Sequence, residues 1–102
     1  MAKVYITELA RQGRDASGKR MVVGEEPGVA NQTVNITASS VQSSAFNAAT
    51  AFVRVSTDAI CSIEIGTNPT ATATTRRLPA NSTEYFAVPI GQSYKLAAIT
   101  NV

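Results

Sequence analysis

The 102-residue sequence contains no histidine and no tryptophan, and its single cysteine is Cys61. Without histidine, the chain lacks the commonest general base and the commonest neutral metal ligand. A lone cysteine cannot close an internal disulfide, which excludes a small secreted scaffold held together by disulfides. We therefore predict a protein that is not an enzyme, with no catalytic residues, no cofactor and no metal site.

Charge and long apolar runs are also scarce. Charged residues make up 16% of the chain, and the net charge of +2 is small. A protein that binds duplex DNA usually carries a strongly basic stripe. No apolar stretch approaches the roughly 18 residues of a membrane span, and the charges within residues 1–20 are unlike a signal peptide. We expect no nucleic-acid or membrane partner and folding in a cytoplasm.

What the sequence does contain is the pattern of β-strands. Valine, isoleucine, threonine and aromatic residues alternate with polar residues in short runs that are separated by turn signals. The predicted strands cover residues 4–9, 20–23, 29–37, 41–46, 51–57, 60–65, 83–88 and 94–100. About eight short strands at this spacing predict one all-β domain over residues 1–102, an antiparallel, jelly-roll-like β-sandwich. Residues 1–20 are expected to form an extended arm or an edge hairpin, and the Thr/Ala-rich residues 70–75 an exposed loop.

The strand pattern also predicts which side chains lie between the two sheets. The expected core consists of large apolar residues that fall on one face of each predicted strand. These are Ile6, Val34, Ile36, Phe46, Val53, Val55, Ile63, Ile65, Phe86, Val88, Leu96 and Ile99.

Several motifs resemble sites of chemistry, but each has a simpler structural interpretation. Residues 13–20 (GRDASGKR) approach a phosphate-binding loop, yet Arg20 replaces the required Ser or Thr, and a strand rather than a helix follows. We interpret this segment as a charged hairpin turn. The carboxylates Asp58, Glu64 and Glu84 are expected to face solvent, Cys61 to be a core residue, and Tyr5, Tyr85 and Tyr94 to lie at the core edge rather than on a sugar-binding platform.

Two groups of cations remain as candidates for a subunit interface. One group lies in and before the predicted hairpin, and the other lies in a predicted loop. Arginine is favoured at protein interfaces, and no aromatic residues are interleaved with these charges as in single-strand nucleic-acid binders. The candidate interface residues are Arg11, Arg14, Lys19, Arg20, Arg76 and Arg77.

Five segments resemble small head proteins of tailed bacteriophages and prophages. They are residues 1–8 (MAKVYITE), 41–47 (VQSSAFN), 57–62 (TDAICS), 66–71 (GTNPTA) and 78–84 (LPANSTE). The resemblance implies a virion protein, made in the bacterial host cytoplasm, that decorates or cements the capsid. Its implied partners are the major capsid protein or other virion subunits, and we expect a homo-oligomer, either a dimer or a trimer. The alternatives are a head–tail adaptor, a tail or fibre component, or a carbohydrate-binding module.

Overall fold

The computed structural model describes residues 2–101, and it is built from antiparallel strands alone within that range. One sheet has the order β4-β1-β6-β9, formed by β1 (Lys3–Leu9), β4 (Ala30–Asn35), β6 (Phe52–Thr57) and β9 (Ser82–Ala87). The second has the order β5-β10-β7-β8, formed by β5 (Val41–Gln42), β7 (Cys61–Gly66), β8 (Arg76–Leu78) and β10 (Lys95–Thr100). These eight strands form the predicted β-sandwich. The Met1 and Val102 ends of the predicted domain lie outside the described residues.

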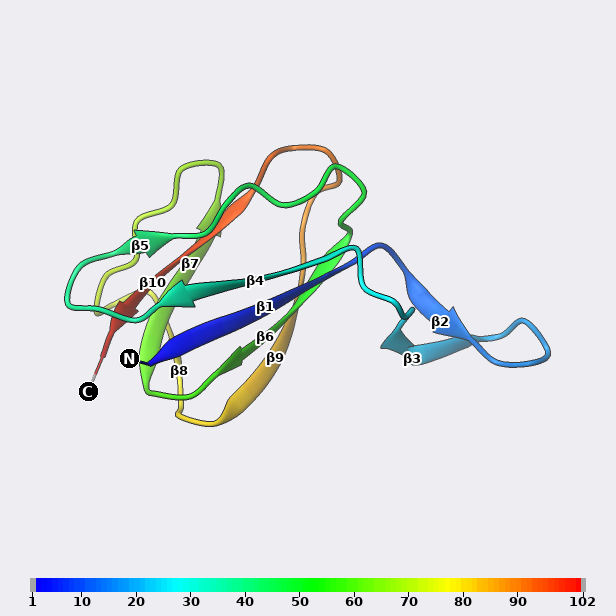
Figure 1. Cartoon of the computed structure of the whole chain (residues 1–102), viewed down its shortest axis with the longest axis horizontal. Helices are drawn as coiled ribbons and strands as arrows, with labels where there is room; N and C mark the ends of the chain where they lie inside the picture. Colours follow the sequence, from blue (N-terminus) through cyan, green and yellow to red (C-terminus); the bar gives the residue numbers. More distant parts are fainter. Residues whose placement is uncertain (1, 102) are drawn as a thin grey trace.

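The order of the strands is that of a jelly roll whose usual last strand comes first. If the eight strands of the sandwich are counted from β4 through β10 and β1 is counted last, they pass between the two sheets in the order of a jelly roll. In this count β1 is the eighth strand, and it lies between β4 and β6. The two ends of the described chain lie close together, because the carbonyl of Ala2 accepts from Ile36 N and Thr100 N donates to the carbonyl of Thr37. Figure 1 shows the N- and C-termini at the same end of the molecule.

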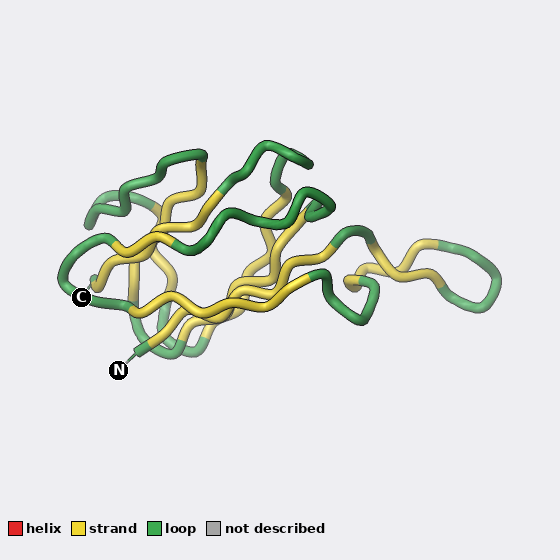
Figure 2. Tube along the Cα trace, turned by 45° about the horizontal axis from the view of Figure 1, so that its top comes forward, coloured by secondary structure: helices red, strands yellow, loops and turns green. Residues whose placement is uncertain are grey.

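The remaining two strands, β2 (Gln12–Arg14) and β3 (Arg20–Gly24), pair with each other in a separate hairpin. The hairpin extends from the end of the sandwich opposite the termini, and it lengthens the molecule to 47 × 27 × 21 Å (Figures 1 and 2). The predicted arm over residues 1–20 therefore takes a different form. Residues 3–9 form a central strand, and only residues 12–24 project as a hairpin.

The core lies between the two sheets and follows the predicted alternation. Val4, Ile6, Val53 and Val55 from one sheet face Cys61, Ile63, Leu96 and Ala98 from the other, and all are nearly inaccessible to solvent. Of the predicted core residues, Val34, Ile36, Phe46 and Val88 are also buried. Ile65 and Phe86 are half-buried, because they pack against the core at its edge.

One expectation about burial was wrong. Ile99 was placed in the core with Leu96, but residues three apart on a strand face opposite sides, so Ile99 lies on the outer face of β10. Residues 70–75 form a loop that is exposed as expected, except at Ala71, which is buried, and Thr75, which is half-buried. It is held in place by Ala71 N, which donates to Ser40 Oγ at 2.9 Å, and by Asn101 Nδ2, which donates to the Ala73 carbonyl.

No helix in the described part of the chain is long and apolar enough to cross a membrane.

Candidate functional site

The β2–β3 hairpin closes through a turn organised by one carboxylate. Asp15 Oδ1 accepts hydrogen bonds from Ser17 Oγ at 2.8 Å, Ser17 N at 2.9 Å and Lys19 N at 3.0 Å. The Ser17 hydroxyl and the neighbouring backbone N–H groups hold the pKa of Asp15 below its ordinary value. Gly18 has a φ of 86°, which only glycine adopts at little cost. Residues 13–20 are therefore a hairpin turn, as expected, rather than a phosphate-binding loop that opens a helix.

The strands of this hairpin expose apolar side chains to solvent. Met21 is 44% exposed, Val22 is 96% exposed and Val23 is 51% exposed, because β2 and β3 project as a separate two-stranded sheet. Met21 and Val23 lie on one face of β3 and Val22 on the other, so the projecting hairpin exposes aliphatic side chains on both faces, and exposed apolar surface of this kind is typical of an interaction site. Residues 12–24 also carry three cations, Arg14, Lys19 and Arg20, against the single carboxylate of Asp15.

The base of the hairpin is fixed to the sandwich by close packing. Leu9 is 2% exposed although it lies on the outer face of β1, because Gly24 and Gly28 cover it. A Cβ atom at Gly24 would lie 2.5 Å from Leu9 Cδ1, so the chain can approach Leu9 this closely only without a side chain. Arg11 Nε also forms an ion pair with Glu25 Oε1 at 2.8 Å across the base. The hairpin therefore has a defined attachment to the sandwich.

The structure separates the two groups of candidate cations. Arg14, Lys19 and Arg20 lie on the hairpin and Arg11 at its base, whereas Arg76 and Arg77 lie on β8, in the part of the sandwich away from the hairpin (Figure 1). The guanidinium of Arg76 lies 4.7 Å from the centre of the Phe86 ring. Six residues that the sequence groups by charge thus belong to two surfaces.

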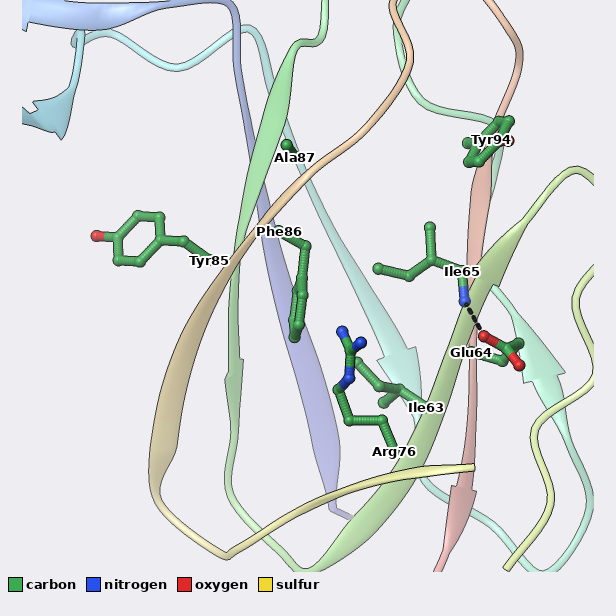
Figure 3. Close-up of a pocket in the computed structure, with 8 residues that line it drawn as sticks. All are labelled: Ile63, Glu64, Ile65, Arg76, Tyr85, Phe86, Ala87 and Tyr94. Atoms are coloured by element: carbon green, nitrogen blue, oxygen red, sulfur yellow. Dashed lines mark hydrogen bonds between the residues drawn. The ribbon is translucent and has the colours of Figure 1, made fainter. Parts of the chain in front are cut away.

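A groove of about 530 Å³ opens between the free edge of β9 and the strands β7 and β8. Ile63, Ile65 and Phe86 supply its apolar wall, and Glu64, Arg76, Tyr85, Ala87 and Tyr94 complete the lining. Figure 3 shows Arg76 extended toward Phe86, and Tyr85 directed away from the groove on the other side of β9. The groove exists because β8 pairs only with Cys61–Ile63 of β7, so within the described residues the edge of β7 over residues 64–66 has no neighbouring strand on that side.

The opposite side of the sandwich is closed by a buried polar network. Glu8, which is 2% exposed, accepts hydrogen bonds from Gln32 Nε2 at 3.1 Å, Asn47 N at 2.6 Å and Thr50 Oγ1 at 2.9 Å. The Gln32 side chain also donates to the Ser44 carbonyl and accepts from Ser44 N, as a strand backbone would. This network ties β1 and β4 to residues 44–50.

Comparisons of the chain with family models, curated proteins and solved structures give no match. The site must therefore be interpreted from its own chemistry. Among residues 2–101, no group of three or more Cys, Asp or Glu side chains is placed to hold a metal ion.

The remaining sequence candidates lie apart from one another. Asp58, Glu64 and Glu84 are all exposed, as expected, and Asp58 Oδ1 accepts from Lys3 N at 2.7 Å. Cys61 is fully buried in the core, and burial raises the pKa of its thiol. Tyr5 and Tyr85 lie on the outer face of one sheet, separated by β6, whereas Tyr94 lines the groove.

Three features of these surfaces were not predicted from the sequence. They are the exposed aliphatic residues Met21–Val23, the groove beside β9 and the buried role of Glu8. The first had a signal, because three consecutive apolar residues follow a turn whose partner strand, Gln12–Arg14, is polar and cannot cover them. The other two depend on which strands lie at the sheet edges, and the alternation of residues carries no information about that.

Proposed function

We propose that this chain is a non-enzymatic structural subunit of a tailed-phage particle, which decorates or cements the capsid by docking its β2–β3 hairpin onto a neighbouring protein subunit. The observation that carries the proposal is the hairpin itself. It projects from a closely packed base, and its apolar residues Met21, Val22 and Val23 are exposed and bordered by cations.

The energetics of the hairpin favour a docking role. An isolated two-stranded hairpin is at best marginally stable in water, so a covering partner would stabilise it. Complete burial of a valine side chain contributes roughly 1.5–3 kcal/mol, and Val22 is almost fully available for this because it is 96% exposed. Within residues 2–101, the salt bridge that forms is the one between Arg11 and Glu25. The other cations of the hairpin, which are Arg14, Lys19 and Arg20, have no carboxylate partner in that range. A fitting partner surface is an apolar hollow with acidic residues at its rim.

The virion assignment rests on the resemblance of residues 1–8, 41–47, 57–62, 66–71 and 78–84 to small phage head proteins. The jelly-roll sandwich and the low charge content are compatible with that role, because charge is depleted in the centres of protein interfaces. A subunit repeated over a shell also gains avidity from many individually weak contacts.

The test is co-sedimentation of the purified chain with capsid shells assembled from the major capsid protein of the same genome. We expect the wild type to pellet with the shells and Val22→Asp to remain in the supernatant. Ile90→Asp is the matched control, because Ile90 is also exposed, at 61%, but lies in the loop before β10. A well-folded wild type that does not pellet with the shells would refute the capsid role. Equal binding of both variants would refute the role of the hairpin.

A further inference from the structure

We infer that β9 is a dimerisation edge, at which two copies of this chain pair through their β9 strands about a two-fold axis. The paired β9 strands would join the two β4-β1-β6-β9 sheets into one continuous sheet. This inference concerns the free protein in solution, and it does not depend on the proposed binding to a capsid.

Among the four edge strands of the sandwich, β9 is the one suited to pairing. β5 has two residues and β8 has three, so both are too short to form a ladder with another chain. β4 is as long as β9, but the Gln32 side chain on the inner face of β4 is hydrogen-bonded to the backbone of Ser44, so residue 44 lies against that strand. β9 has six residues (STEYFA) without proline, lysine or a bulge, and its one edge-protecting feature is the inward-facing charge of Glu84, opposite the core residue Val55, for which a pairing partner must supply an opposite charge.

Both faces of β9 carry apolar surface that such a partner would cover. On the outer face, Tyr85 is 55% exposed beside Phe52, at a hollow of about 220 Å³ that Val22 and Val23 also line. On the inner face, Phe86 lies on the wall of the groove. Alternating side chains of an added strand therefore meet an apolar surface on each side, which is the arrangement typical of strand addition to a sheet edge.

The register with Tyr85 at the two-fold axis suits the residues of β9. In an antiparallel pair, directly opposite residues share a face, so two-fold pairing places one residue of β9 opposite its own copy. With Tyr85 at the axis, the two tyrosines form an aromatic cross-strand pair, which is favourable. With Glu84 at the axis, two carboxylates would meet, which is unfavourable.

The Tyr85 register also brings opposite charges together. It places Glu84 of each copy opposite Phe86 of the other, and the Phe86 ring carries the Arg76 guanidinium at 4.7 Å. Within the described part of one chain, neither Glu84 nor Arg76 forms a salt bridge. The dimer thus gives each a partner, in two symmetric Glu84–Arg76 ion pairs at the mouths of the grooves.

The experiment measures mass in solution by light scattering over a dilution series, for the wild type and for charge-swapped variants. We expect the wild type to form a dimer. Glu84→Arg and Arg76→Glu should each weaken dimerisation about tenfold or more, because each places like charges together. The double variant should recover the wild-type dissociation constant. Arg77→Glu is the control, because Arg77 lies on the outer face of β8, and it should leave the dimer unchanged.

Three outcomes would overturn the inference. A wild type that stays monomeric at every concentration would leave β9 free for another partner. A trimer would exclude two-fold pairing. A dimer that tolerates both single variants would place the interface elsewhere, and hydrogen exchange would then show β9 amides that exchange equally fast in monomer and dimer. Circular dichroism of each variant separates loss of pairing from loss of folding.

Discussion

Replacement of Glu8 by alanine should cause a large loss of stability. Glu8 lies on the central strand β1, is 2% exposed, and its two carboxylate oxygens accept from Gln32 Nε2, Asn47 N and Thr50 Oγ1. The Glu8→Ala variant leaves three donors without their acceptor in a region that water scarcely reaches. It also removes the connection between β1 and residues 47–50.

The magnitude follows from the kind of hydrogen bond that is lost. A hydrogen bond to a charged group contributes roughly 1.5–3 kcal/mol net, and a buried donor left unpaired costs about 1–3 kcal/mol. The three terms are not additive, because residues 44–50 lie near the surface and water can replace part of the network. We therefore expect Glu8→Ala to lower the free energy of unfolding by about 3 kcal/mol, at the upper end of the usual range for a single substitution. Small domains have only about 5–15 kcal/mol in total.

The assay is urea denaturation at one fixed protein concentration, followed by circular dichroism. Glu8→Gln keeps one acceptor oxygen but turns an amide toward the donors, so its loss should fall between those of the alanine variant and the wild type. Glu64→Ala is the matched control on an exposed strand position, with an expected change within about 0.5 kcal/mol. If Glu8→Ala were no more destabilising than Glu64→Ala, the network would contribute nothing to the fold.

Two further predictions concern the attachment of the hairpin and the buried thiol. Gly24→Ala should lower the free energy of unfolding by about 1–3 kcal/mol in urea denaturation, because the added Cβ would lie 2.5 Å from Leu9 Cδ1. Gly66→Ala is the control and should not destabilise the chain, because a Cβ there meets nothing within 4 Å. Equal urea midpoints for the two variants would show that Leu9 moves aside freely. Burial raises the pKa of the Cys61 thiol, so the thiol ionises at a lower pH in the unfolded chain than in the folded chain. The contribution of Cys61 to the free energy of unfolding is therefore fully present below the ordinary pKa of the thiol, and it is lost as the pH rises through the raised pKa of the folded state. As the pH rises above about 8.5, the ordinary pKa of a cysteine thiol, the wild type should therefore lose more stability than Cys61→Ala, and parallel curves would contradict the assignment.

Local pattern was enough to find most of the strands. The alternation in residues 51–57 and 60–65 predicted β6 and β7 within one residue at each end, because β-branched residues on one face and polar residues on the other suit a half-buried strand. The same alternation, applied strictly, would have excluded Ile99 from the core. The strand β8 was missed because Arg76 and Arg77 carry no apolar signal, and the pairing with β7 supplies their conformation.

The surfaces were less predictable than the strands, because they depend on contacts between residues far apart in the sequence. The cations at Arg14 and Arg76 look alike in the sequence, yet one lies on the projecting hairpin and the other lies over Phe86. Glu8 looks like an exposed strand carboxylate until Asn47 and Thr50 are placed beside it. The sequence signal for residues 70–75 was equally incomplete, since Ser40 and Asn101 anchor that loop.

The positions of the first and last strands have a consequence for protein synthesis. β1 lies between β4 and β6, and β10 lies between β5 and β7. The first strand can pair with β4 soon after the hairpin is made, but the second sheet has no centre until residues 95–100 have left the ribosome. Until then β5 and β7 have no strand between them, and the apolar faces of the first sheet stay open to solvent. A nascent chain of this kind is expected to acquire its cooperative fold only after residues 95–100 have emerged, which makes the interval before that the period of greatest exposure to aggregation.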